Sequence, residues 1–302
     1  MKQNSSNTDE IFLAAFFSGE RYASADTGLQ IGVSLDGKTF GNISKEKKPI
    51  FLPRHGVRDP HILYRRNHWY MVYSYGSDIS PVVIIAKSKD LFHLEEVIVL
   101  RMAEDNPSGN NYVDVPSWVV DSNGSVHIIG CIDYNHHWVT RRPVCDNPDH
   151  WGKPDAWLPP VEMTDINGGA LIQGNSSVIQ KDGVFYMAYN THLDHVMNMR
   201  TSKHIDREWS APRRNNIYCE KDKSESENLL IMGNGAFRFY VSGSNSFQYK
   251  LWYVTSGDLG YTWTEPTYLE FTGFDHRVNW AQVIRITEPK AITFLTESFL
   301  LH

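Results

Sequence analysis

The chain has 302 residues, of which 41% are hydrophobic and 21% are charged, and its formal net charge is −6. This composition is typical of a globular protein with a sizeable core. The negative charge argues against the basic surface that binds nucleic acid, so we expect no nucleic-acid partner. The three cysteines, Cys131, Cys145 and Cys219, are odd in number and irregularly spaced, which excludes a disulfide framework or a zinc-finger pattern.

The N-terminal segment is polar up to residue 10 and is followed by the apolar run "IFLAAFF", from Ile11 to Phe17. Seven residues are too few for a membrane span, and the preceding flank is wrong for a signal peptide. We therefore expect no membrane partner. The compartment stays open between the cytoplasm and a secreted or periplasmic location reached after removal of a signal.

From residue 57 onward the sequence repeats one unit: an apolar strand, a polar turn, and a second strand rich in Tyr and Phe. The copies are residues 61–74, 117–130, 177–190 and 229–242, and a weaker fifth copy begins at Ala281. A third strand that ends in Ser and an aromatic turn follows several copies. The repeats start near residues 57, 113, 173, 225 and 277. Regular spacing of short strands predicts an all-β fold built from blades.

The two ends of the chain complete each other. Residues 29–40, "LQIGVSLDGKTF", match the third-strand pattern but have no inner strand before them, and the fifth copy has an inner strand with little after it. A propeller closes its ring in this way, with one blade shared between the termini. We therefore predict a single domain, residues 1–302, that forms a five-bladed β-propeller, and an irregular β-sandwich is the alternative.

Inner strands of a propeller line the central channel, and their first residues open at one face. An eight-residue spacing, as from Ile62 to Tyr70, superimposes the copies. In this register the position of Asp59 is held in the next three blades by Val115, Asn175 and Glu227. Carboxylates facing a shared channel are costly to desolvate unless they are paired or used. Asp59 and Glu227 lie three blades apart in a ring of five, so we expect them to face each other across the channel.

The motif "RDPHI" (58–62) before the strand "WYMVYS", the "SKDL" after it and the five-blade layout resemble glycoside hydrolase family 43. The spacing of the blade repeats resembles the family over the whole chain, and "RDPHI" is the one motif that matches it closely residue by residue. The resemblance implies hydrolysis of arabinose-, xylose- or galactose-containing glycans with inversion. It also implies Asp59 as general base, Glu227 as general acid and Asn175 at the place of an orienting Asp. An inverting enzyme holds its two carboxyls roughly 6.5–9.5 Å apart.

Two positions depart from the family pattern. Asn175 lies in "GNSSVI" where the family has an Asp-Pro step, and Glu227 lies in "SESENLLI" where it has Glu-Gly-Pro. Glu225, two residues earlier, is the alternative acid. An amide can orient a neighbour but cannot supply the negative charge that keeps a carboxyl protonated. Asp114, next to Val115, is the candidate to supply that charge.

Further candidates for contact with a carbohydrate substrate are Arg58, Trp118, His136, His192, His276 and Arg277. Arg58 could instead form an ion pair and Trp118 could pack in the core. By the resemblance, His276 lies near the channel axis, where a structural Ca²⁺ or Na⁺ ion could bind. The His-containing stretches 133–138 and 191–195 lack a helical metal-binding pattern, so we expect no catalytic metal and no required cofactor.

"SGDLGYTW", residues 256–263, matches a turn box found in sialidases. We expect Asp258 to cap its own turn and Trp263 to pack between strands, which is a folding role. Residues Arg141 to Pro160, with five prolines and two tryptophans, predict a long loop at the pocket rim or a decorated turn. Two functions remain in view: a glycoside hydrolase, or a catalytically degenerate propeller that binds a glycan or a protein.

Overall fold

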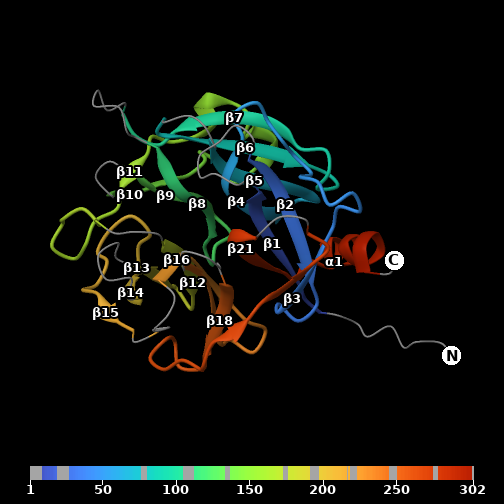
Figure 1. Cartoon of the computed structure of the whole chain (residues 1–302). Coiled ribbons are helices and arrows are strands. Elements are labelled where there is room, and N and C mark those ends of the chain that lie inside the picture. The colour runs from blue at the N-terminus through green and yellow to red at the C-terminus, as the bar shows by residue number, and fades with distance from the viewer. Residues whose placement is uncertain are drawn as a thin grey trace.

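The computed structural model describes residues 9–18, 27–75, 80–104, 112–132, 137–172, 176–190, 197–215, 217, 223–244, 250–274 and 278–300. These residues form five sheets, antiparallel except for one outer strand pair, arranged as a five-bladed β-propeller (Figure 1). The predicted fold class is confirmed. The inner strands begin at residues 57, 113, 176, 223 and 279, within three residues of the predicted starts.

Each blade runs from an inner strand at the channel to an outer strand at the rim (Figure 1). Blade I contains β4 (Val57–Arg65), β5 (His68–Tyr75), β6 (Val82–Ser88) and β7 (Glu95–Arg101). Blade II contains β8 (Val113–Val120), β9 (Val126–Ile132), β10 (His137–Arg141) and β11 (Val161–Glu162). Blade III contains β12 (Ser176–Lys181), β13 (Val184–Asn190), β14 (Met197–Ser202) and β15 (Arg213–Arg214). Blade IV contains β16 (Lys223–Ile231), β17 (Phe237–Ser244), β18 (Lys250–Ser256) and β19 (Thr267–Tyr268).

The fifth blade closes the ring with strands from both ends of the chain. Its order is β21 (Asn279–Ile286), β1 (Ile11–Ser18), β2 (Gly28–Ser34), β3 (Thr39–Asn42) and β20 (Glu270–Thr272). The C-terminal β21 is the inner strand, and β1 pairs with it antiparallel. Residues 29–34 lie in the third strand, as predicted, while "IFLAAFF" supplies the second strand. The outermost β20 pairs with β3 in parallel and gives this blade a fifth strand.

The fifth copy of the repeat supplies an inner strand with no second strand after it, as the sequence indicated. After β21 the chain forms α1 (Pro289–Leu295) and a π-helical turn (Thr296–Leu300). Because β1 already occupies the edge of β21, these residues have no strand to pair with. Pro289 has no N–H to donate and suits a first helical turn. Among the described residues, no helix is long and apolar enough to cross a membrane.

Both faces of each sheet are buried because every blade packs between two neighbours. In β5, Met71 and Tyr73 pack with the closing blade, while Tyr70 and Val72 pack with blade II. This explains why strands such as "WYMVYS" are apolar almost throughout rather than strictly alternating. The core is therefore a series of apolar layers between blades around a central channel.

Turns after the third strands repeat one device. β2, β6, β14 and β18 all end in a serine, namely Ser34, Ser88, Ser202 and Ser256. In blade IV the Ser256 hydroxyl donates to Asp258 at 2.7 Å, and Asp258 accepts from the N–H of Thr262 at 2.8 Å. Trp263 packs against the apolar layer between blades III and IV. Both predicted roles in this turn, capping by Asp258 and packing by Trp263, are confirmed.

The proline-rich segment 141–160 contributes to the core rather than to the predicted pocket rim. It contains the 3₁₀ turns η1 (Pro148–His150) and η2 (Pro154–Ala156), and Trp151 and Trp157 are buried between blades I and II. Arg66, in the turn that follows β4, donates to Asn147 at 2.6 Å. The segment thus lies at the end of β4 opposite Asp59. Its two indoles are buried there because burying large aromatic side chains is favourable.

Candidate functional site

The candidate site is built on two equivalent β-bulges at the starts of β4 and β8. Asp59 in β4 has φ 49° and Val115 in β8 has φ 47°. The ladder skips these residues and the prolines that follow them, Pro60 and Pro116. Proline has no N–H for the ladder, so it is tolerated at a bulge. The sequences "VRDP" and "VDVP" therefore adopt one backbone shape, and Asp59 and Val115 hold equivalent positions, as the repeat predicted.

Arg58 joins the two bulges through its guanidinium. Its Nε lies 3.4 Å from Oδ2 of Asp59, and its Nη2 pairs with Oδ1 of Asp114. The same guanidinium lies over the ring of Tyr112, 4.1 Å from the centroid. Arg58 and Asp59 are only 3% and 4% exposed. Two carboxyl groups thus share one guanidinium inside the protein.

Burial dominates the electrostatics of Asp59. Desolvation raises the pKa of its carboxyl, and this is offset in part by the Arg58 charge and by a hydrogen bond from the Val115 N–H at 3.4 Å. A carboxylate with a raised pKa is a stronger base than an exposed one. Asp114 forms an ion pair with Arg58, so it belongs to the same charged cluster as Asp59.

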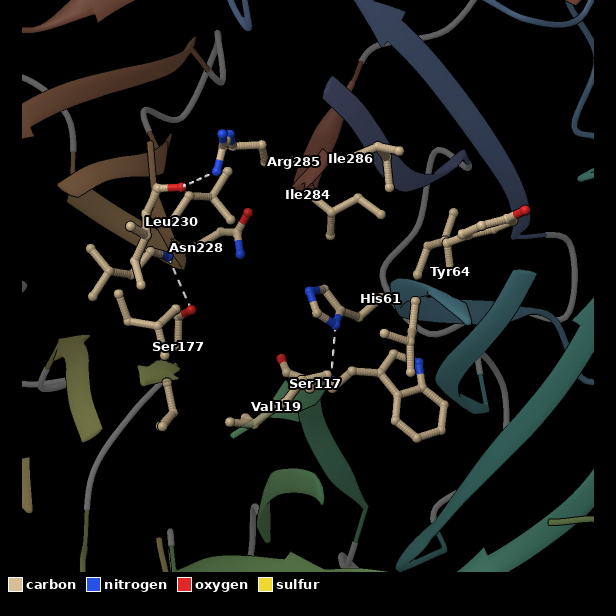
Figure 2. A pocket seen from close by; sticks show the side chains of 18 of the residues that line it. His61, Tyr64, Ser117, Val119, Ser177, Asn228, Leu230, Ile284, Arg285 and Ile286 are labelled. Carbon is tan, nitrogen blue, oxygen red and sulfur yellow. Dashed lines mark hydrogen bonds between the residues drawn. The ribbon is translucent and has the colours of Figure 1, made fainter. Parts of the chain in front are cut away.

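His61 lies directly beyond the bulge and is held as a neutral imidazole. Burial lowers its pKa to about 4. Its Nδ1 accepts a hydrogen bond from the backbone N–H of Trp118 at 2.9 Å, which places the ring proton on Nε2 (Figure 2). Blades III and IV are joined by a similar hydrogen bond between a side chain and the next blade's backbone. The Ser177 hydroxyl accepts from the N–H of Leu229 at 3.0 Å.

Residues of all five inner strands line the far half of the channel. His61, Ser117, Ser177, Asn228 and Ile284 are the first lining residue in each strand, and they surround a cavity of roughly 280 Å³ (Figure 2). The cavity continues past the end of β21 to Glu288. It therefore opens on the side of the propeller opposite the two bulges.

This arrangement corrects the register of β16 by one residue. Leu229 packs between blades III and IV, as Trp118 does between blades I and II, and Asn228 takes the position of His61. The position of Asp59 is then held in blade IV by Ser226 rather than by Glu227. Equal spacing failed because two-residue turns follow β4 and β12, while residues 121–125 and 232–236 form longer loops after β8 and β16.

Both glutamates nevertheless belong to the start of β16, the end equivalent to the bulges. In the corrected register Glu225 takes the position of Arg58 and Asp114, and Glu227 takes that of Pro60. β16 has its own register shift between Glu225 and Glu227. The strand that carries the candidate acid therefore has an irregularity at the same place as β4 and β8.

Several predicted site residues lie outside the described residues: Asn175, His136, His192, His276 and Arg277. Among the described ones, Trp118 lies in the core, where its ring stacks on Trp151 with centroids 5.4 Å apart. Trp118 therefore packs in the core, which was the alternative to stacking on a sugar. His137, next to the predicted His136, pairs through Nδ1 with Glu162 at 2.6 Å.

In the described part of the chain, no three His, Cys, Asp or Glu side chains are grouped closely enough to hold a metal ion. The ion expected near His276 stays a prediction, because that residue lies outside the described ranges. Cys131 is a buried thiol in β9, within the layer between blades II and III.

The sequence analysis found no carboxylate at Val115, the position equivalent to Asp59, and missed the hydrogen bond that its backbone donates. Its backbone N–H, turned by the bulge, is a hydrogen-bond donor to Asp59. The signal for this was the proline shared by "VRDP" and "VDVP", which marks the same break in both ladders. A residue can serve a site through its backbone while its side chain is apolar.

Comparisons with known proteins agree on the fold. No protein-family model and no curated protein sequence matches the chain. Among solved structures, it is similar to an exo-β-1,3-galactanase from Clostridium thermocellum, with TM-score 0.60 and 12% identity over 96% of this chain and 72% of the other. A family 43 β-1,3-galactosidase gives TM-score 0.56 and 13% identity over 88% and 92% of the two chains. A family 43 endo-arabinanase from Bacillus licheniformis gives 0.55 and 15% over 88% and 95%. The chain thus has the five-bladed propeller fold seen in glycoside hydrolase family 43, as the sequence predicted.

Proposed function

We propose that this protein is a glycoside hydrolase that cleaves arabinose-, xylose- or galactose-type glycosidic bonds with inversion. The observation that carries the proposal is Asp59: a carboxylate buried at the start of an inner strand, with a raised pKa, in a fold shared with galactanases and arabinanases. A buried carboxyl group whose pKa is shifted in this way is a candidate for chemistry.

In this proposal Asp59 is the general base. It takes a proton from a water molecule, which attacks the anomeric carbon from the face opposite the leaving oxygen. The Val115 N–H and the Arg58 guanidinium hold its Oδ2 in one orientation. Arg58 also contacts Asp114, so it positions the base and balances its charge.

The general acid is proposed to come from β16, with Glu227 as the first candidate and Glu225 as the second. Blades I and IV are separated by the closing blade, so their inner strands are not neighbours and leave room between them. That arrangement suits a substrate and an attacking water between two carboxyls. Asn175 is proposed to orient the acid, and His136, His192, His276 and Arg277 to contact the sugar.

A glycan-binding or protein-binding module without turnover is the second candidate function. It is favoured by the ion pairs of Arg58, which engage both Asp59 and Asp114 inside the protein. A carboxylate held in this way can stabilise the strand ends without touching a substrate.

The test is a screen of aryl arabinosides, xylosides and galactosides, followed by Asp59→Asn, Glu227→Gln and Glu225→Gln on the best substrate. Asp59→Asn should lower kcat by roughly 10²–10⁴-fold, since it removes general-base catalysis. One of the two glutamate variants should cause a comparable loss on substrates with poor leaving groups and a smaller loss on activated aryl glycosides, which need less acid assistance.

Asp121→Asn is a matched control, because Asp121 lies in the turn after β8, at the opposite end of the inner strand. Proton NMR of the first-formed product gives the stereochemistry. Activity that survives Asp59→Asn, or a product with retained configuration, contradicts the proposed mechanism. Binding of oligosaccharides with no turnover across the whole panel supports the binding module.

A further inference from the structure

A second cavity lies between the outer parts of blades III and IV, away from the inner strands. It has a volume of roughly 310 Å³, at the small end for ligand pockets, and it is lined in part by Arg214, Asn215, Tyr261, Trp263 and Glu265. These residues come from β15, from the chain just beyond it, and from the turn and loop between β18 and β19. No residue of the Asp59 cluster takes part.

Tyr261 is a large aromatic side chain held rigidly in an exposed position. It is 70% exposed. The guanidinium of Arg213 lies over its ring, 3.8 Å from the centroid, and donates hydrogen bonds to the carbonyls of Leu259 at 3.2 Å and Gly260 at 2.9 Å. The cation therefore fixes one side of the ring and the backbone beside it, which lowers the entropy cost of binding at this ring.

Asp258 fixes the backbone that carries Tyr261. Its carboxylate accepts the N–H of Tyr261 at 3.0 Å and both the N–H and the hydroxyl of Thr262, at 2.8 and 2.7 Å. These hydrogen bonds, those from Thr262 first, lower the pKa of Asp258 to about 2. The Asp258 carboxyl thus stays ionised at any ordinary pH and keeps its hydrogen bonds to the turn.

Asn215 contributes a buried amide side chain to the lining of the cavity. Asn215 is only 5% exposed, and its Nδ2 has no hydrogen-bond partner among the described residues. Buried amide donors are nearly always satisfied, so this amide can donate to an acceptor that the described residues do not provide. Nearby, the Trp263 Nε1 donates to the carbonyl of Gly260 at 3.2 Å, which fixes the tilt of the indole.

We propose that this cavity is a binding site for one neutral sugar unit of a polysaccharide. The fixed Tyr261 ring and the Trp263 indole provide apolar surface for the C–H face of a sugar ring, and Asn215 and Glu265 provide a donor and an acceptor for its hydroxyls. Arg214 and Glu265 bring opposite charges, so the site selects neither acidic nor basic sugars. The site does not depend on catalysis at Asp59.

The test is affinity electrophoresis of the whole protein in native gels that contain arabinan, xylan or galactan, with polygalacturonate as the acidic comparison. We expect at least one neutral polysaccharide to retard the wild-type protein, and Tyr261→Ala to weaken this binding by about 3- to 10-fold. Tyr268→Ala is the matched control, because Tyr268 is an exposed tyrosine of the same blade outside the cavity, and it should bind like wild type. Thermal melting checks that both variants fold.

Asn215→Asp provides a second, independent variant, since it keeps the shape of the side chain and removes the amide donor. It should also weaken retardation. The proposal is overturned if wild-type protein migrates freely in all three neutral gels, if only polygalacturonate retards it, or if Tyr261→Ala is retarded as strongly as wild type. Asp59→Asn should bind normally in these gels, so failure of this site and failure of the hydrolase proposal give different results.

Discussion

β4 and β8 have nearly the same backbone at their starts but carry different chemistry. Both break their ladders before a proline, and both place one residue at a positive φ close to 48°, Asp59 in one strand and Val115 in the other. A β-branched residue at such a φ is an outlier, because its branched Cβ crowds the backbone. The shape of the bulge is therefore a property of the repeat and does not depend on which side chain stands there.

The difference teaches how a repeated fold builds an unrepeated site. In β4 the bulge carries a carboxylate, and in β8 the same bulge presents a backbone N–H to that carboxylate. Arg58 and Asp114, also at equivalent positions, carry opposite charges and pair with each other. Two copies of one backbone shape thus become complementary halves of one cluster.

Removing the shared cation should have the largest effect on this cluster. Arg58→Met keeps the length of the side chain but leaves Asp59 and Asp114 buried without their counter-ion. We expect the free energy of unfolding to fall by about 3–5 kcal/mol at pH 7, as for other broken buried ion pairs. Urea denaturation followed by tryptophan fluorescence measures this loss.

The pH dependence of the Arg58→Met variant separates charge from packing. Without the cation the pKa of Asp59 should rise further, so the variant should regain stability as the pH falls and the carboxyl becomes neutral. The double variant Arg58→Met/Asp114→Asn should recover part of the loss at pH 7. A single variant within about 1 kcal/mol of wild type would show that the cluster is not a coupled unit.

The two strands also differ two residues further on, where β4 has His61 and β8 has Ser117. Because burial lowers the pKa of His61 to about 4, the unfolded chain binds its proton more readily than the folded one. This contribution to stability is complete above about pH 6.5 and is lost as the pH falls towards 4. It amounts to about 3 kcal/mol over that range.

His61→Asn keeps an acceptor for the Trp118 N–H and cannot be protonated. Its urea midpoint should therefore change less than that of wild type between pH 7 and pH 4. His127 is also buried with a lowered pKa, and Asp59 titrates with the opposite sign, but both are present in the two proteins and cancel in the difference. Identical pH profiles for wild type and His61→Asn would contradict the neutral, buried state of this imidazole.

Most of the fold could be predicted from the sequence because the repeat determines it. The inner strands, the shared blade and the Ser-terminated third strands were all readable from residue patterns. The absence of a second strand after β21 was also readable, but the helical form of the residues from Pro289 was not, because it depends on β1 already pairing with β21, a contact between the two ends of the chain. Trp151 and Trp157 were also missed, since a proline-rich loop gives no sign that its indoles enter the core.

The candidate site was less predictable than the fold. "RDPHI" identified Asp59, and the eight-residue spacing aligned it correctly with Val115. The alignment of β16 was wrong by one residue, because loop length after an inner strand does not constrain the register at its start. The Arg58–Asp114 pair was visible only in three dimensions, since the two residues belong to different blades and neither sequence contains both charges.

The smallest expected effect tests the strain at the second bulge. Val115→Gly removes a buried side chain but also relieves a positive φ, which costs roughly 1–3 kcal/mol for a residue other than glycine. The two contributions oppose each other, so we expect a net loss of only about 1 kcal/mol in the free energy of unfolding. The contact from the residue 115 N–H to Asp59 should remain, because it belongs to the backbone.

Val119→Gly is the matched comparison, since Val119 lies in the same strand, has the same 2% exposure and lies in the regular part of the ladder. There the change loses packing and adds the entropy cost of glycine with no strain to relieve, so the loss should be about 3 kcal/mol. If the two variants lose equal stability, the bulge in β8 stores no strain. In that case β8 would keep its shape because valine tolerates it, and the N–H contact to Asp59 would be formed at no cost to the fold.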